Sequence, residues 1–92
     1  MKLNKIIFMG TPEYSTIILN SLIENNFNIV AVFTQPDKPF GRKKLLKMPH
    51  IKDFIINNSI NIPIFQPDNL INTKTYNDIS QLNPDFIIVA AY

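Results

Sequence analysis

KIIFMGTPEYSTIILNSLIENN, residues 5–26, is the stretch that most constrains the fold. Its first part, KIIFMG (5–10), is a short apolar run that ends in glycine, which is typical of a buried strand. A helix is expected to follow, because Thr11 suits the N-cap, Pro12 the first helical position and Glu13 the positive end of the helix dipole. One helix face is then expected to pack on a sheet through residues at helical spacing: Tyr14, Ile17, Ile18, Leu22 and Ile23.

Strand and helix patterns alternate along the rest of the chain. NIVAVFT (28–34), NIPIF (61–65) and DFIIVAA (85–91) are expected strands, and Pro63 indicates an edge position for NIPIF. Helices are expected at 51–59 and 72–82, with these residues facing inward: Ile51, Phe54, Ile55, Tyr76, Ile79 and Leu82. This order predicts parallel, right-handed βαβ units. The predicted fold class is α/β: part of a doubly wound, Rossmann-like parallel sheet of four strands in the order 3-2-1-4, with three helices.

The expected strand at 85–91 bears on domain organisation. Its FIIVAA run is apolar without alternation, which suits a strand covered on both faces, whereas natural proteins avoid apolar, unpaired sheet edges. Tyr92 follows at the carboxyl end of this strand, next to the switch point where open α/β sheets build their sites. We therefore expect residues 1–92 to be the N-terminal part of a longer protein, with its chemistry beyond Tyr92.

Composition places the chain among globular proteins. It is 46% hydrophobic and 17% charged, and its 92 residues suit one small domain. Its apolar runs are far shorter than the roughly 20 residues of a membrane helix, and no signal-peptide pattern is present. The absence of cysteine excludes disulfides and thiolate metal sites. We expect a cytoplasmic protein with no membrane partner.

QPDKPFGRKKLLKMPH (35–50) differs from its apolar surroundings. Residues 36–52 hold six of the nine basic residues and one acidic residue, while the rest of the chain holds three basic and six acidic residues. Three of the seven prolines restrict this segment, and Phe40 and Gly41 stand beside Arg42. Lysines on a surface loop are often merely solvated, but this clustering predicts contact with nucleic acid or polyphosphate.

The remaining motifs give no catalytic constellation. GTPEY (10–14) has one glycine where nucleotide-binding proteins carry GxGxxG or GxxxxGK[ST], so dinucleotide binding is disfavoured. The turn is explained either as a Pro-started helix or as a loop that lines a site. His50, the single histidine, has no neighbouring histidine for a metal pair and is expected to be a surface or capping residue. We expect no metal site and no catalytic residue within the chain.

Four segments, in this order and spacing, closely resemble the beginning of the methionyl-tRNA formyltransferases: IIFMGTPEYS, AVFTQPDKPFGRKKL, IPIFQPDNL and NPDFIIVAAY. The resemblance covers essentially the whole chain. It implies a Rossmann-like catalytic domain that moves a formyl group from 10-formyltetrahydrofolate to the amino group of methionine on initiator tRNA. It further implies a monomer that uses no metal ion.

The resemblance also implies roles for individual residues. The segment 35–50 would reach towards the tRNA acceptor end and bind it through Phe40, Gly41, Arg42, Lys43, Lys44 and Lys47. The turn after the first strand would line the substrate pocket through Gly10, Thr11, Pro12 and Tyr14. The catalytic Asn, His and Asp of the family lie beyond the equivalent of Tyr92, and the folate-binding residues stay unassigned.

One departure and two alternatives accompany the resemblance. The family's loop resembles GRGKKLxPSPVK, whereas this chain has GRKKLLKMPHIK, so the charge is kept while the second glycine is lost. A related formyltransferase acting on an amino-sugar nucleotide would share the sheet and the folate chemistry, but its substrate needs no strongly basic loop. A non-catalytic nucleic-acid-binding module would use the same loop without any formyl transfer.

Overall fold

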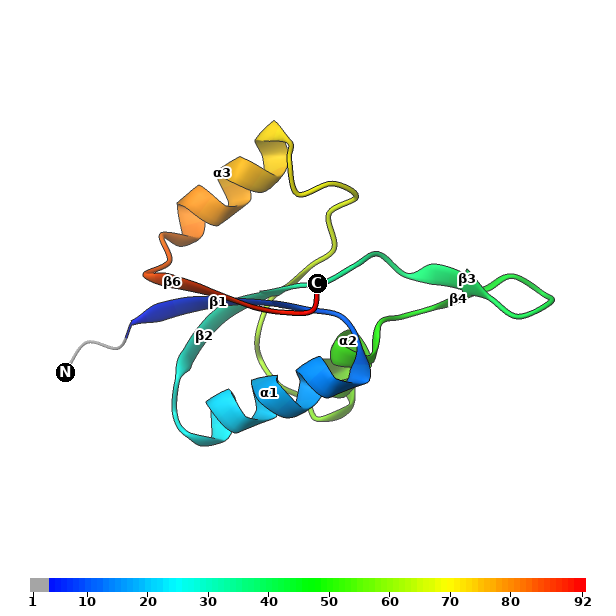
Figure 1. Ribbon diagram of the computed structural model, residues 1–92, viewed down its shortest axis with the longest axis horizontal. Helices are drawn as coiled ribbons and strands as arrows, with labels where there is room; N and C mark the ends of the chain where they lie inside the picture. The colour runs from blue at the N-terminus through cyan, green and yellow to red at the C-terminus, as the bar shows by residue number, and fades with distance from the viewer. Residues whose placement is uncertain (1–3) are drawn as a thin grey trace.

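The computed structural model describes residues 4–92 and shows an α/β fold (Figure 1). Four parallel strands form one sheet in the order β5-β2-β1-β6, which is the predicted order 3-2-1-4. Two further short strands, β3 and β4, form an antiparallel hairpin outside this sheet. The elements are β1 (Lys5–Gly10), α1 (Glu13–Glu24), β2 (Asn28–Phe33), β3 (Lys38–Phe40), β4 (Leu45–Lys47), α2 (His50–Asn57), β5 (Ile64–Phe65), α3 (Thr73–Leu82) and β6 (Phe86–Ala90).

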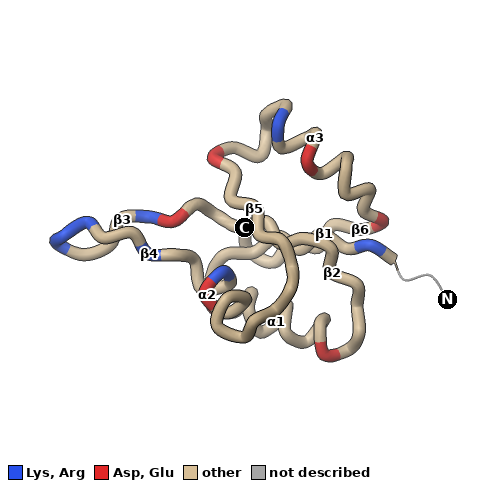
Figure 2. Tube along the Cα trace, turned by 180° about the vertical axis from the view of Figure 1, so that it is seen from behind, with Lys and Arg blue, Asp and Glu red and all other residues tan. Residues whose placement is uncertain are grey.

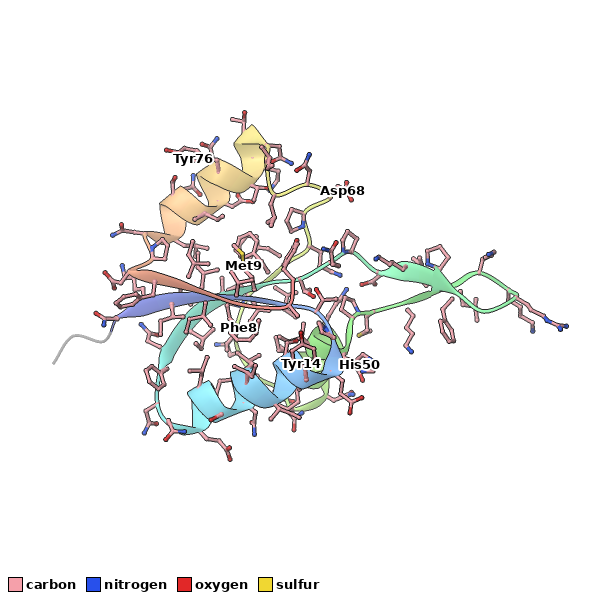
Figure 3. All side chains as sticks on the ribbon, viewed as in Figure 1. Phe8, Met9, Tyr14, His50, Asp68 and Tyr76 are labelled. Atoms are coloured by element: carbon pink, nitrogen blue, oxygen red, sulfur yellow. The ribbon has the colours of Figure 1, made fainter. Side chains whose placement is uncertain are left out.

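Helices cover both faces of the sheet, as the doubly wound prediction requires (Figure 1). On one face, Phe8 and Val32 pack with buried residues of α1 and α2, such as Leu19 and Ile51. On the other face, Met9 packs in a second cluster that includes residues of α3. Figure 3 shows Phe8 and Met9 on opposite sides of β1, as alternation along a strand dictates. The central strand is therefore buried on both faces.

Two expected helix faces were wrong in part. In α1 the buried positions are Ser15 and Leu19, whereas Tyr14, Ile17 and Ile18 are 55%, 68% and 39% exposed. In α3 the inward positions begin at Thr75, and Tyr76 is 70% exposed. In both helices a small polar residue in the first turn is buried, and the neighbouring aromatic residue is turned about 100° away from it. Apolar type alone therefore did not identify the buried face.

The start of α1 also differs from the prediction. Pro12, and not Thr11, is the N-cap residue, and no side chain caps the helix. The carbonyl oxygen of Pro12 accepts hydrogen bonds from the backbone N–H and the hydroxyl of Ser15. The Thr11 hydroxyl is free to bond elsewhere because it is turned away from the helix and towards the ends of the strands.

The expected strands and the other helices are present with shifted bounds. NIPIF contributes only Ile64 and Phe65 to the sheet, and β5 lies at the edge, where Pro63 predicted it. The helix α2 buries Ile51 and Ile55, as expected. Within residues 4–92, no helix is long and apolar enough to cross a membrane.

Gly10 ends β1 at a position with no room for a side chain. A Cβ atom there would lie 2.8 Å from Cβ of Ser15, 2.9 Å from the Phe8 ring and 3.0 Å from the carbonyl oxygen of Ala90. The first neighbour belongs to α1 and the last to β6, so the absence of a side chain lets both elements approach β1.

We expect Gly10→Ala to lower the free energy of unfolding by about 1–3 kcal/mol, because the backbone of β6 cannot move away without disturbing its pairing with β1. Urea unfolding of the complete gene product containing residues 1–92 measures this. Ser21→Ala, at an exposed position of α1, should change stability by less than about 0.5 kcal/mol. Equal stabilities of Gly10→Ala and Ser21→Ala would contradict the packing role of Gly10.

Candidate functional site

The candidate site lies at the carboxyl ends of the parallel strands, and this side of the sheet is the edge meant below. Because β1, β2, β5 and β6 run in the same direction, the residues that follow them gather at one edge. Thr11 follows β1, Gln35 closely follows β2, Gln66 follows β5, and Tyr92 lies beyond β6. Open α/β sheets characteristically bind their ligands at this edge.

A hydrogen-bond network centred on the Thr11 hydroxyl joins three strand ends. Thr11 Oγ1 donates to the carbonyl oxygen of Tyr92 at 3.0 Å and accepts from Thr34 Oγ1 at 3.2 Å and from the backbone N–H of Gln35 at 3.3 Å. Gln35 Nε2 donates to the same Tyr92 carbonyl at 3.1 Å. Burial raises the pKa of the Tyr92 phenol, whose hydroxyl donates to the carbonyl oxygen of Thr34. The Thr11 hydroxyl thus connects the ends of β1, β2 and β6 by hydrogen bonds.

A second polar group, which we call the Asp37 cluster, consists of Asp37, Lys52 and Gln66. Lys52 Nζ lies 3.2 and 3.3 Å from the two carboxylate oxygens of Asp37 and donates to Gln66 Oε1 at 2.8 Å. Gln66 Nε2 donates to Asp37 Oδ1 at 2.7 Å and to the carbonyl oxygen of Gln35 at 3.1 Å. These hydrogen bonds from Gln66, then from Lys52 with its charge, outweigh desolvation and hold the pKa of Asp37 below its usual value of 3.8.

The predicted basic loop is a hairpin that extends from the sheet (Figures 1 and 2). The basic hairpin comprises residues 38–47, with three cross-strand pairs: Lys38 with Lys47, Pro39 with Leu46, and Phe40 with Leu45. All of its residues are exposed. Lys47 Nζ lies 4.5 Å from the centre of the Phe40 ring, a cation–π contact. The Lys38–Lys47 pair places two like charges opposite each other, which is unfavourable without an anion nearby.

The tip of the basic hairpin concentrates its charge. Arg42, Lys43 and Lys44 follow Gly41 in the turn, and Figure 2 shows their positive charge at the far end of the hairpin. Gly41 has φ +76° and Lys44 has φ +55°, and the Lys44 N–H donates to the Gly41 carbonyl oxygen at 3.3 Å. A lysine in the left-handed region is strained by roughly 1–2 kcal/mol. The turn therefore exposes three cations to solvent at a conformational cost.

A small hollow connects the basic hairpin with the turn after β1. It has a volume of about 230 Å³, and its lining includes Thr11, Gln35, Phe40, Lys47 and His50. Figure 3 shows Tyr14 and His50 at the end of the molecule from which the hairpin extends. The structure thus brings Phe40 and Lys47 of the predicted tRNA-binding residues close to Thr11 of the predicted substrate turn. The other four, Gly41 to Lys44, lie in the turn of the hairpin and do not line this hollow. Gly10 and Pro12 belong to the substrate turn as backbone positions, with Gly10 buried beneath it.

Residues 4–92 offer exposed cations and hydrogen-bonded polar side chains at this site. His50 is the exposed first residue of α2, as expected of a surface residue, and the Asp37 carboxylate is paired with Lys52. No group of three or more potential metal-ligating side chains was found among these described residues. The exposed cations of the hairpin can neutralise phosphates, while the polar groups at the strand ends hold the backbone.

Sequence patterns did not reveal the Asp37 cluster or the hairpin pairing. Lys52 is one of the six basic residues counted in residues 36–52, and the structure pairs it with Asp37, with a side chain only 21% exposed. Gln35 and Gln66 each precede a proline, in the QP pairs of TQPD and FQPD. Gln66 directly follows β5, and Gln35 lies two residues after the end of β2. This repeated placement of a glutamine after a strand was the sequence signal that could have indicated the Asp37 cluster.

The sequence of this chain was compared with known protein families and with curated proteins. The sequence model of the formyl transferase family matches residues 4–92. The chain belongs to the formyl transferase family. The alternation of strand and helix patterns had predicted the parallel sheet and its strand order, and the resemblance to formyltransferases implied the same Rossmann-like fold.

Several curated relatives in the formyl transferase family are named methionyl-tRNA formyltransferase. The relative from Campylobacter hominis is 56% identical over 88 residues, covering 96% of this chain and 29% of the relative. That from Nitratiruptor sp. is 53% identical over 88 residues, with the same coverage of 96% and 29%. One from Campylobacter jejuni is 54% identical over 91 residues, covering 98% and 30%. This member of the family spans about 30% of the length of the curated relatives it matches.

The lowered pKa of Asp37 predicts a specific pH dependence. A carboxyl group whose folded-state pKa lies below its unfolded value of 3.8 stabilises the folded protein above that pH and loses this contribution as the pH falls through the folded-state pKa. Asp37→Asn should therefore be less stable than the wild type at pH 7, and the difference should shrink below pH 3.8. Urea unfolding across this pH range measures it. In a Gln66→Met background the pH-dependent part should be smaller; an undiminished effect would contradict the role of Gln66.

Proposed function

We propose that the protein containing residues 1–92 transfers a formyl group from 10-formyltetrahydrofolate to the amino group of methionyl initiator tRNA. The name shared by relatives that are 50–56% identical supports this reaction. The basic hairpin beside the strand ends is the structural observation that carries it, because an exposed group of cations there suits a polyanionic substrate. The amino-sugar nucleotide alternative gains no comparable support.

The proposed chemistry is acyl transfer. The methionyl nitrogen attacks the formyl carbon, a new C–N bond forms, the bond from that carbon to the folate nitrogen breaks, and one proton passes from the amine to the leaving nitrogen. Such a reaction needs groups that move the proton and stabilise the oxyanion. We assign these roles to residues that follow residue 92 in the longer protein, and we assign none of the described residues to the folate.

The proposed role of this chain is to bind and orient the tRNA. Lys38, Lys47 and the three cations of the turn form a basic surface on the exposed hairpin. Phosphates close to this surface would relieve the repulsion between Lys38 and Lys47, so affinity should fall as salt rises. Phe40 and Gly41 contribute an exposed ring and an open backbone beside these cations. The turn at Gly10, Thr11, Pro12 and Tyr14 would lie near the aminoacyl end.

We further propose that residues 1–92 form the N-terminal part of a catalytic domain in a cytoplasmic, monomeric enzyme. The share of the relatives' length that the chain spans supports the domain assignment. The remaining parts of the catalytic domain and a C-terminal tRNA-binding domain would complete the enzyme. The proposed partner is initiator methionyl-tRNA, with no metal ion and no membrane.

The tRNA role is tested by replacing Arg42, Lys43 and Lys44 together with alanine in the complete gene product. Each lost phosphate contact should reduce the slope of log affinity against log salt by about 0.7–0.9, so the slope should fall by roughly 2–3. Filter binding to initiator tRNA measures this. Lys74→Ala, at an exposed α3 lysine paired with Asp78, is the control and should leave the slope unchanged. A triple variant with unchanged binding and slope would refute the proposed role of the hairpin.

The division of labour predicts that a polypeptide of residues 1–92 alone has no formyltransferase activity, because the proposed proton-transferring groups are absent from it. Incubation with 10-formyltetrahydrofolate and methionyl-tRNA, followed by detection of formylmethionine, measures this. The complete gene product should formylate the tRNA under the same conditions. Formylation by residues 1–92 alone would contradict this division, and no formylation by the complete product would contradict the proposed reaction.

A further inference from the structure

We propose that the Asp37 cluster positions the basic hairpin for tRNA, so that Asp37, Lys52 and Gln66 are positioning residues for the substrate. The inference rests on the proposed function and deepens it. None of these three side chains needs to touch the tRNA. Each acts through the orientation of the hairpin, which carries the exposed cations.

The cluster lies where the chain passes into and out of the hairpin. Asp37 immediately precedes β3, and Lys52 lies in the first turn of α2, shortly after β4 ends at Lys47. The Asp37–Lys52 ion pair therefore joins the two segments that lead into and out of the hairpin. Gln66 connects this pair to the sheet, because its amide nitrogen donates both to Asp37 and to the carbonyl oxygen of Gln35 just beyond β2.

The hairpin itself supplies little that could fix its direction. It has three cross-strand pairs, and an isolated two-stranded hairpin is at best marginally stable in water. Its apolar side chains are exposed: Phe40 by 64%, Leu45 by 67% and Leu46 by 71%. The first cross-strand pair, Lys38 with Lys47, is repulsive. By contrast, the side chains of Asp37 and Lys52 are only 29% and 21% exposed, so the constraint on direction lies at the base.

The contacts of Lys52 argue against a direct role in binding phosphate. Its ammonium group has three donors, and it contacts both oxygens of Asp37 and the amide oxygen of Gln66. Its charge is thus neutralised within the protein, unlike the charges of the exposed hairpin cations.

The change in tRNA affinity of Asp37→Ala has opposite signs if the cluster positions the hairpin and if it acts only through its charge. Asp37→Ala removes a negative charge close to a polyanion site, so charge alone predicts tighter tRNA binding. Loss of the cluster predicts weaker binding, because the hairpin cations lose their fixed orientation. Gln66→Met removes the amide without changing any charge, and its effect on tRNA binding therefore reports orientation alone.

The experiment measures formylation kinetics of the complete gene product in four forms: wild type, Asp37→Ala, Gln66→Met and Asp53→Ala. We expect the KM for methionyl-tRNA to rise about tenfold in the first two variants, as expected for loss of a hydrogen bond to a charged group. The kcat and the KM for the formyl donor should change by less than about twofold. Asp53→Ala is the matched control, since it removes the same charge from an exposed position of α2 that bonds only Asn57 within its helix. Its KM for tRNA should stay equal or fall.

A second readout does not depend on the reaction. Trypsin cleavage in the Arg42–Lys44 turn under native conditions should be several-fold faster in Asp37→Ala and Gln66→Met than in the wild type or Asp53→Ala. If the wild type does not formylate methionyl-tRNA, the proposed function fails while the cleavage rates still test the cluster. The inference is overturned if Asp37→Ala binds tRNA more tightly, or if both variants keep the wild-type KM and cleavage rate. It is also overturned if they only lower the Tm, which a purely structural role would do. If Asp37→Ala fails to fold, Gln66→Met decides the matter.

Discussion

The double pairing of the central strand β1 is the constraint on which the rest of the structure depends. This strand pairs in parallel with β2 on one side and with β6 on the other, and it is buried between two apolar clusters. The helix α1 and the strand β6 both approach its carboxyl end closely, and Gly10 permits this because it has no side chain. Parallel pairing also brings the ends of the strands to one edge, so the geometry of the candidate site follows from the geometry of the core.

Two polar networks convert that edge into a defined surface. The Thr11 hydroxyl joins the chain beyond β2 to the chain beyond β6, while Gln66 joins the end of β5 to the base of the hairpin. Both networks use amide and hydroxyl groups that are partly buried, where a hydrogen bond is worth more than at a fully exposed position. The exposed cations of the hairpin are thus attached to a base that hydrogen bonds hold to α2 and to the residues that follow β2 and β5. Fixed charges of this kind can orient a flexible polyanion, whereas charges on an unattached loop would only attract it.

How far the sequence predicted the site depends on the kind of interaction. The basic segment was evident from the clustering of Lys and Arg, and the turn after β1 was evident from its place between a strand and a helix. Their closeness across the hollow between Thr11 and His50 came from the fold. The pairing of Lys52 was not predicted, because a lysine paired with an aspartate 15 residues away has the same sequence appearance as a free one.

The sequence by itself determined the three helices, the four parallel strands and their order, because apolar periodicity and helix-starting residues act between near neighbours in the chain. It also determined that one segment carries most of the positive charge. It did not reveal the β3–β4 hairpin. Only the tertiary structure decided that Ser15 and not Tyr14 faces the sheet, and that Gln66 meets Asp37 and Gln35. The physical reason is distance along the chain: a hydrogen bond between residues about 30 positions apart leaves no periodic trace, and it forms only after the strands have placed both partners at the same edge.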